Sequence, residues 1–159
     1  QSTDDGVTWS HMFKSPDGWE CWQVIKVSTD RYTDVWWPRE ERGGNSRLRV
    51  YTVDRRRSDG GLTWRDVTVP SHVNITFTRL AYDGRQNIFT TDYDNRAVHV
   101  WSVSGQYDRQ LLSPDLHLTN RPRCLAMDTS RDGHVTLYVG QSQHYGRGSV
   151  VGVWTLTYQ

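Results

Sequence analysis

The sequence predicts an all-β fold built from repeated antiparallel sheets, and three observations support this prediction. Short runs rich in Val, Ile, Thr, Tyr and Trp are separated by Gly, Asn and Asp turns along the chain. No segment carries a long apolar stripe of helical period. The order of strands and turns also repeats, with a spacing typical of four-stranded units. We therefore expect strands throughout and no helix longer than two turns.

The clearest unit lies in the middle of the chain, where four expected strands are separated by turn-forming residues. Turns are indicated at residues 83–87, at residues 93–96 and at Ser104-Gly105, because Gly, Asn and Asp tolerate turn conformations. The fourth strand of the unit is poor in apolar residues, as is typical of the edge of a sheet. Over the whole chain, strands are expected near residues 22–28, 34–38, 47–53, 62–69, 78–83, 87–92, 97–103, 107–112, 123–128, 135–140 and 150–157.

These strands group into three units, at about residues 20–69, 78–112 and 121–157. Units of this size with four strands are typical of the blades of a β-propeller. Gly6-Val7-Thr8-Trp9 matches Gly61-Leu62-Thr63-Trp64, and the two segments are 55 residues apart, as are Val27 and Tyr82 at equivalent first-strand positions. Residues 6–13 are therefore expected to form a fourth strand, whereas the last unit has only three.

This strand count predicts the assembly of the chain. We expect residues 1–159 to form one half-propeller domain, because three blades cannot close a ring that needs about 4–8. In a homodimer, residues 6–13 of each copy would complete the last blade of the other and give a six-bladed ring. The competing interpretation is that the chain is a fragment of a larger propeller.

Two segments resemble NHL repeats. NIFTTDYDNRAVHV (residues 87–100) has the order of turn, apolar strand, Asp, Asn and apolar strand, and RPRCLAMD (residues 121–128) resembles the entry to another repeat. The chain as a whole resembles the C-terminal part of the NHL propellers of invertebrate, molluscan-type tripartite-motif-like proteins, most closely over residues 78–154. Over residues 20–69 it departs from the pattern, with Trp36-Trp37-Pro38 in place of Asp and small residues. The resemblance implies a six-bladed propeller that recognises a protein or an RNA.

The composition disfavours several classes of function. The formal net charge is +1, from 19 Lys and Arg against 18 Asp and Glu, which disfavours RNA as a ligand held by charge. No apolar stretch approaches the length of a membrane helix, so no membrane partner is expected.

The two cysteines, Cys21 and Cys124, do not indicate a cellular compartment. A secreted protein is expected if the ligand is a glycan, and a cytoplasmic one if the chain belongs to a tripartite-motif-like protein. Asn74 opens a glycosylation sequon, a triplet that often occurs by chance.

No catalytic, metal or cofactor motif is apparent, and we expect neither an enzyme nor a cofactor. His99 lies between two valines and is interpreted as a packing residue rather than a metal ligand. Residues 128–133 lack the ligand spacing of a calcium loop and are interpreted as a β-turn. The run Arg55-Arg56-Arg57 is interpreted as a solvated hairpin turn, with phosphate binding as the rival hypothesis.

Ligand-binding residues are expected on the loops at one end of the units, since binding residues are commonly carried by loops on a rigid scaffold. Aromatic, amide and guanidinium groups occur together there and suit sugars, peptides or single-stranded RNA. The candidates between second and third strands are Trp37, Arg39, Tyr93, Asp94, Asn95, Arg96, Gln141, His144, Tyr145 and Arg147, together with Asn45. Loops between units add Lys14, Trp19, His72, Asn74, Asn120 and Arg121. The recurring Trp9, Trp64, Trp101 and Trp154 are expected to pack between units instead.

Two functional hypotheses follow. The first is a small, multivalent, lectin-like protein that binds carbohydrate, supported by near-zero net charge, abundant Trp and Tyr and repeated loops. The second is a protein- or RNA-substrate recognition module of a tripartite-motif-like ubiquitin ligase, as the family resemblance implies.

Overall fold

The computed structural model describes the chain in segments. These are residues 23–29, 31–39, 47–59, 61–75, 78–111, 118, 120–131, 134–142 and 149–157. For residues 37, 39, 130, 131, 134, 142 and 149–157 only the backbone is described. The expected strand at residues 6–13 lies outside the described residues.

Each of the eleven strands expected from the sequence is present, and the described residues contain no helix. The strands are β1 (Ile25–Ser28), β2 (Tyr32–Arg39), β3 (Arg47–Asp54), β4 (Thr63–Asp66), β5 (Leu80–Tyr82), β6 (Asn87–Asp92), β7 (Ala97–Ser102), β8 (Tyr107–Leu111), β9 (Arg121–Arg131), β10 (His134–Ser142) and β11 (Ser149–Thr157). The all-β prediction is confirmed.

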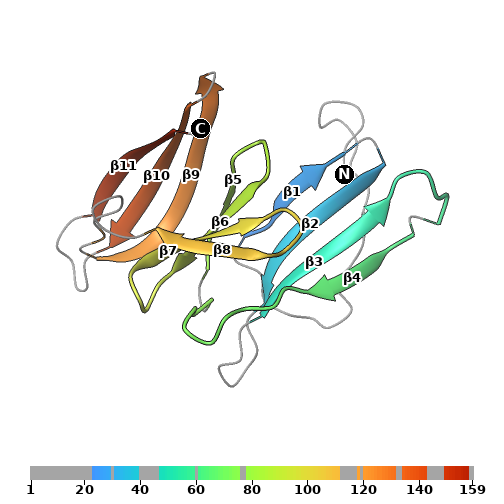
Figure 1. Cartoon of the computed structure of the whole chain (residues 1–159), viewed down its shortest axis with the longest axis horizontal. Coiled ribbons are helices and arrows are strands. Elements are labelled where there is room, and N and C mark those ends of the chain that lie inside the picture. Colours follow the sequence, from blue (N-terminus) through green and yellow to red (C-terminus); the bar gives the residue numbers. More distant parts are fainter. Residues whose placement is uncertain are drawn as a thin grey trace.

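The strands form three antiparallel sheets that follow the order of the chain (Figure 1). Two sheets have four strands, in the orders β1-β2-β3-β4 and β5-β6-β7-β8, and the third has the order β11-β10-β9. In each sheet, neighbouring strands are consecutive in the sequence, so every connection within a sheet is a hairpin. Among the described residues the third sheet lacks the fourth strand that the other two possess.

Two hydrophobic cores lie between the sheets, and the middle sheet contributes side chains to both. Ile88 on β6 and Trp101 on β7 belong to the core shared with the first sheet, whereas Phe89 and Val100 belong to the core shared with the third. Successive side chains of a strand point to opposite faces of the sheet, which explains this division. The middle sheet is therefore buried on both faces, while the hairpin ends remain at the surface.

The first strands of the three sheets lie beside one another, since β1 contacts β5 and β5 contacts β9. Gln23, just before β1, reinforces the first of these contacts. Its side-chain amide donates to the carbonyl of Leu80 at 2.9 Å and accepts from the amide of Leu80 at 3.1 Å. Gln23 thus mimics a pairing strand and connects the inner edges of two sheets.

The hairpin at residues 83–87 shows how the sequence specifies the turns. The buried Asp83 carboxylate accepts hydrogen bonds from the backbone amides of Arg85, Gln86 and Asn87 at 2.8–3.0 Å. Gly84 adopts a φ of 76°, in the left-handed region that favours glycine. Asp83 therefore satisfies the turn amides that no strand partner reaches.

The tryptophan prediction is correct for Trp101 and wrong for Trp64. Trp101 is fully buried between sheets and donates its indole N–H to the Thr90 hydroxyl at 2.8 Å. Trp64 lies on the outer strand β4 with 55% of its surface exposed. Instead of packing between sheets, it stacks on the guanidinium of Arg49, whose carbon lies 3.8 Å from the ring centroid. An outer strand presents one face to solvent, so the Trp64 ring is covered only in part, by the side chain of Arg49 on the neighbouring strand.

Two other turn predictions have different outcomes. The arginine run lies in the exposed turn between β3 and β4, where Arg57 pairs with Asp59 at 2.7 Å, as expected of a solvated hairpin. Asp128, by contrast, is not in a turn. It lies on β9 and pairs with Thr136, with a register shift next to Thr136, and β9 continues to Arg131, three residues beyond the expected end of the strand.

Candidate functional site

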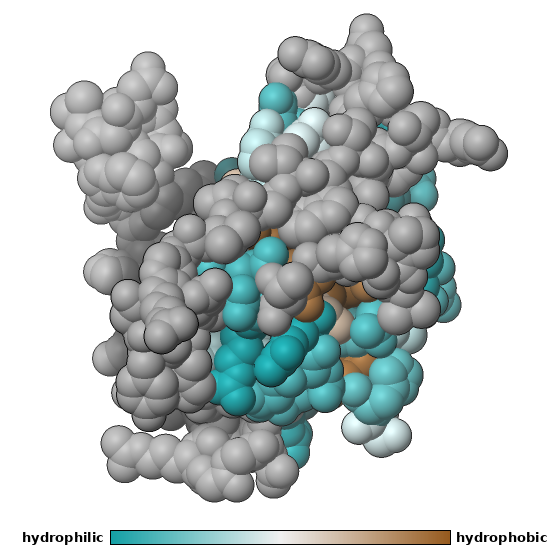
Figure 2. All heavy atoms as spheres, turned by 90° about the vertical axis from the view of Figure 1, so that its left-hand side faces the viewer, coloured by the Kyte–Doolittle hydropathy of each residue, from teal (hydrophilic) through white to brown (hydrophobic). Residues whose placement is uncertain are grey.

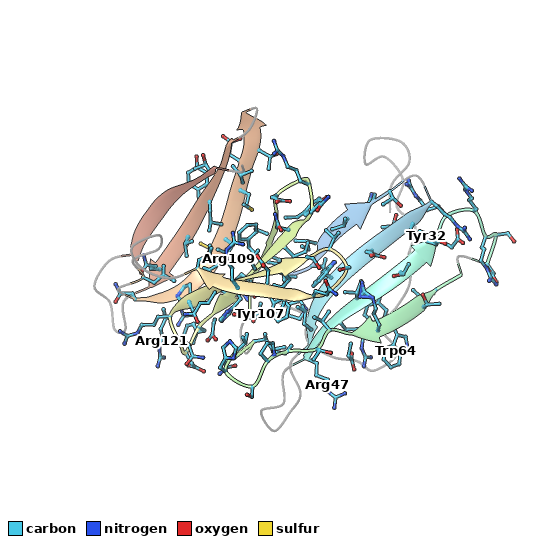
Figure 3. The ribbon with its side chains drawn as sticks, in the orientation of Figure 1. Tyr32, Arg47, Trp64, Tyr107, Arg109 and Arg121 are labelled. Atoms are coloured by element: carbon cyan, nitrogen blue, oxygen red, sulfur yellow. The ribbon has the colours of Figure 1, made fainter. Side chains whose placement is uncertain are left out.

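Three segments that are far apart in the sequence meet at one end of the sheets. The turn at residues 93–96, between β6 and β7, lies between residues 72–75, which precede β5, and the first residues of β9. The Asn74 side-chain amide donates to Asp94 at 2.9 Å, and that of Asn95 donates to the His72 carbonyl at 3.3 Å. Figure 3 shows Arg121, the first residue of β9, at the end of the molecule opposite Tyr32.

The turn is held in place by a buried hydrogen-bond network, called here the Asp92 network, which consists of Asp92, Asn74, Asn95 and His99. The fully buried Asp92 carboxylate accepts from the backbone amides of Asn74 and Asn95 at 2.8 and 2.9 Å. It also accepts from the Asn95 side chain at 2.9 Å and from His99 Nε2 at 3.1 Å. Burial alone would raise the pKa of Asp92, but the hydrogen bonds from His99, Asn95 and Asn74 lower it below its usual value.

The network continues from His99 towards the surface. His99 Nδ1 shares a hydrogen bond of 3.2 Å with the Tyr107 hydroxyl, which lies 3.4 Å from Nε2 of the exposed His72. Burial, with the charge of Asp108, raises the pKa of Tyr107, so its hydroxyl is a poor nucleophile near neutral pH. A carboxylate, an imidazole and a hydroxyl in a row resemble a catalytic relay, but this geometry suits an anchor that holds the turn and β8 together.

The residue that follows Asp92 belongs to a second group, the Tyr93 cluster, which consists of Tyr93, Arg121 and Arg123. Arg121 Nη1 and Arg123 Nη2 lie 3.4 and 2.9 Å from the Tyr93 hydroxyl oxygen. Their guanidinium carbons lie 4.8 and 5.1 Å from the centroid of its ring. The hydrogen bond from Arg121, with the charge of Arg123, holds the pKa of Tyr93 below its usual value. Two cations thus converge on one neutral phenol, at a position that favours negative charge.

No model of a known protein family and no curated protein matches this chain. The resemblance to NHL repeats therefore stands on the quoted residues alone. The chemistry of the site has to be inferred from the side chains that converge there.

The structure brings together part of the predicted set. Tyr93, Asp94 and Asn95 lie on the turn with Arg96, which closes it with a φ of 53°. Their neighbours include three residues expected from the loops between units, namely His72, Asn74 and Arg121. The predicted residues His144, Tyr145, Arg147, Asn45, Lys14 and Trp19 lie outside the described residues.

Three predicted loop residues lie on strands instead. Trp37 and Arg39 belong to β2, where they pair with Arg49 and Arg47; β2 ends at Arg39, one residue beyond the expected end of the strand at residue 38. Gln141 belongs to β10 and is only 4% exposed. Its side-chain oxygen accepts from the backbone amide of Asn120 at 2.9 Å, so Gln141 positions the entry to β9 rather than facing a ligand.

The sequence reasoning missed Arg123, Asp92 and Tyr107 as members of the site. Arg123 was assigned to the first strand of the last unit, which is correct, but residues two apart on a strand share a face. The pattern Arg121-x-Arg123 could therefore have indicated two guanidinium groups side by side. Asp92 directly precedes the expected turn at residues 93–96, and Asp side chains commonly accept hydrogen bonds from nearby turn amides.

A separate cleft lies between the first and middle sheets, away from the predicted residues. It has a volume of about 320 Å³ and is lined mainly by apolar surface. Its polar residues include Asp34, which accepts from the Thr52 hydroxyl at 2.6 Å, and Arg65. The full lining is Val27, Thr29, Tyr32, Asp34, Thr52, Arg65, Val103 and Ser104.

Other kinds of site are not apparent in the described part of the chain. It contains no group of three or more His, Cys, Asp or Glu side chains arranged to hold a metal ion. It also contains no helix long and apolar enough to cross a membrane. From the side of β9–β11, the visible surface of the described residues is mainly hydrophilic, with a small hydrophobic area among them (Figure 2).

Proposed function

We propose that the three sheets are blades of an NHL-type β-propeller. Three features support this proposal. The sheets stack face to face across two cores, their first strands adjoin one another, and the fourth strands β4 and β8 lie at exposed outer edges. A radial arrangement of four-stranded blades has these properties, with first strands innermost.

The proposal extends to a homodimer of two half-propellers. Trp64 lies on β4, a fourth strand, and Gly61-Leu62-Thr63-Trp64 is the segment that residues 6–9 resemble. Within the described residues, β11 pairs with β10 alone and leaves a strand edge. Residues 6–13 of a second copy would cover this edge, and exchange in both directions would yield six blades.

The proposed function of this scaffold is non-catalytic recognition of carbohydrate, with one site per blade end and multivalent binding in the dimer. The observation that carries the proposal is the convergence of the Tyr93 cluster with Asp94 and Asn95 on a turn anchored by the buried Asp92. The guanidinium groups of Arg121 and Arg123 on β9, together with a carboxylate and an amide on the rigid turn, supply the directional hydrogen bonds that sugar hydroxyls require. Repetition compensates for the weakness of each contact.

A glycan array probed with the full chain tests this function. Tyr93→Ala should weaken binding of any captured glycan by about tenfold or more, since it removes the group on which two arginines converge. Tyr32→Ala is the matched control, because Tyr32 also lies beside an arginine, with the Arg31 carbon 4.8 Å from its ring centroid, but at the opposite end of the molecule. Equal binding by both variants, or capture of no glycan, would contradict the proposal.

The second candidate function is recognition of a protein or RNA substrate within a tripartite-motif-like ubiquitin ligase. The paired guanidinium groups of Arg121 and Arg123 favour it, because arginines contact phosphates and acidic side chains. Binding of single-stranded RNA or an acidic peptide that is lost in Tyr93→Ala, with no glycan captured, would select this function.

A further inference from the structure

The Tyr93 cluster differs from a simple sugar-stacking platform. Both guanidinium carbons lie about 5 Å from the Tyr93 ring centroid, so arginines rather than a ligand occupy ring surface. Arg121 and Arg123 reach the ring from one strand, β9, which shifts register between Pro122 and Cys124, opposite Gln141 and Gly140. The polar groups of this cluster, more than its aromatic surface, are therefore what a ligand would contact.

The charge of the cluster is not balanced by the group on which it converges. Tyr93 is a neutral phenol, so the hydrogen bonds that it accepts from Arg121 and Arg123 orient the guanidinium groups without cancelling either positive charge. The neighbouring carboxylate is Asp94, which already accepts from the Asn74 amide at 2.9 Å. Arg123 and Asp94 are exposed, so the guanidinium group of Arg123 and the Asp94 carboxylate both lie at the surface.

We propose that the Tyr93 cluster selects acidic saccharides and binds their carboxylate between Arg121 and Arg123. This inference rests on the proposed carbohydrate function and names the ligand class of the same site. An arginine presents N–H donors in a planar fork that matches a carboxylate, which accepts hydrogen bonds only. Asp94 and Asn95, next in the chain, supply acceptors for the hydroxyl groups of the same sugar ring.

The test compares two probes that differ by one carboxylate. Oligosaccharides ending in glucuronic acid or in glucose, otherwise identical, are titrated into the full chain and followed by NMR. The acidic probe should bind on the order of tenfold more tightly, as expected for one or two charge-assisted hydrogen bonds. The preference should shrink as salt is added, because exposed charges are screened.

Variants of the two arginines test whether the Tyr93 cluster causes the preference for the acidic probe. Arg121→Gln and Arg123→Gln should each reduce binding of the glucuronate probe to roughly that of the glucose probe and leave glucose binding nearly unchanged. Arg121→Lys should retain part of the preference, since it keeps the charge but loses the fork. Arg56→Gln is the matched control for net charge, because Arg56 is exposed in the turn between β3 and β4, at the other end of the sheets. Thermal denaturation of each variant checks that it folds.

The outcomes separate the two proposals. Equal binding of both probes would overturn the acidic preference and leave carbohydrate recognition standing. Binding of neither probe, with glycans captured elsewhere on an array, would also overturn the preference. Binding of an acidic peptide or RNA in place of any saccharide would overturn both proposals. A preference lost equally in Arg56→Gln would show that net charge, not this cluster, causes it.

Discussion

His99 and Asp92 form a buried pair in which the imidazole Nε2 lies 3.1 Å from the carboxylate, with both side chains at most 1% exposed. The carboxylate can only accept, so Nε2 carries the shared proton. The pair joins the middle of β7 to the end of β6 and so holds the turn that presents Tyr93. Removing one partner would leave buried polar groups without hydrogen bonds, which is costly inside a protein.

Asp92→Asn should lower the free energy of unfolding of the chain and make that free energy less dependent on pH. The pKa of Asp92 is lower in the folded than in the unfolded chain, so its contribution is complete above about pH 3.9 and is lost as the pH falls through the folded value. The variant should lose about 1–3 kcal/mol of unfolding free energy at neutral pH, and less at low pH. Urea denaturation between about pH 2.5 and 7 measures both effects. Asp108→Asn, at an exposed position on β8, should behave like the original chain; a constant loss at every pH for Asp92→Asn would contradict the prediction.

Gly140→Ala should destabilise the sheet of β9–β11 because of one neighbour. A Cβ at position 140 would clash with the sulfur of Cys124, which pairs with Gly140 across the strands. Such overpacking costs about 1–3 kcal/mol. Adding Cys124→Ala should restore most of the loss, because the remaining Cβ would lie 3.8 Å away. Denaturation of the single and double variants measures the coupling, and additive losses would exclude this contact as the cause.

The Tyr93 hydroxyl should report on the arginines that surround it. Its pKa lies below the usual tyrosine value because of the hydrogen bond from Arg121 and the charge of Arg123. In Arg121→Gln the pKa of Tyr93 should rise towards that value of about 10. NMR titration of the tyrosine ring carbons measures it, with Arg56→Gln as the variant that should not move it. An unchanged pKa in Arg121→Gln would mean that the two side chains do not meet in solution.

The proposed strand exchange predicts the oligomeric state of the chain in solution. The full chain should sediment as a compact dimer at micromolar concentration, because residues 6–13 of each copy would cover β11 of the other. Deletion of residues 1–13 should abolish the dimer. Trp9→Ala should weaken it, by analogy with Trp64 on β4. A well-folded monomer of the full chain would exclude the six-bladed dimer.

The sequence alone was sufficient to predict all eleven strands, their hairpin order and the turns at residues 83–87 and 93–96. These features depend on short-range signals, namely alternating apolar residues, β-branched and aromatic runs, and Asp or Gly at positions that need side-chain capping or positive φ. The ends of strands were less accurate. Trp37, Arg39 and Gln141 lie on strands because the hydrogen-bond ladder of a hairpin continues as long as its partner strand does, and that partner is not visible in local sequence.

Only the tertiary structure decided which side chains meet. Asp92 and Asn74 are connected across the boundary between two units, and Tyr93 reaches Arg121 and Arg123 in the next sheet. The exposure of Trp64 likewise depends on the position of β4 at an outer edge. Periodicity specifies the face of a strand on which a residue lies, but contacts between sheets depend on how the sheets stack, and that follows from packing of the two cores rather than from local pattern.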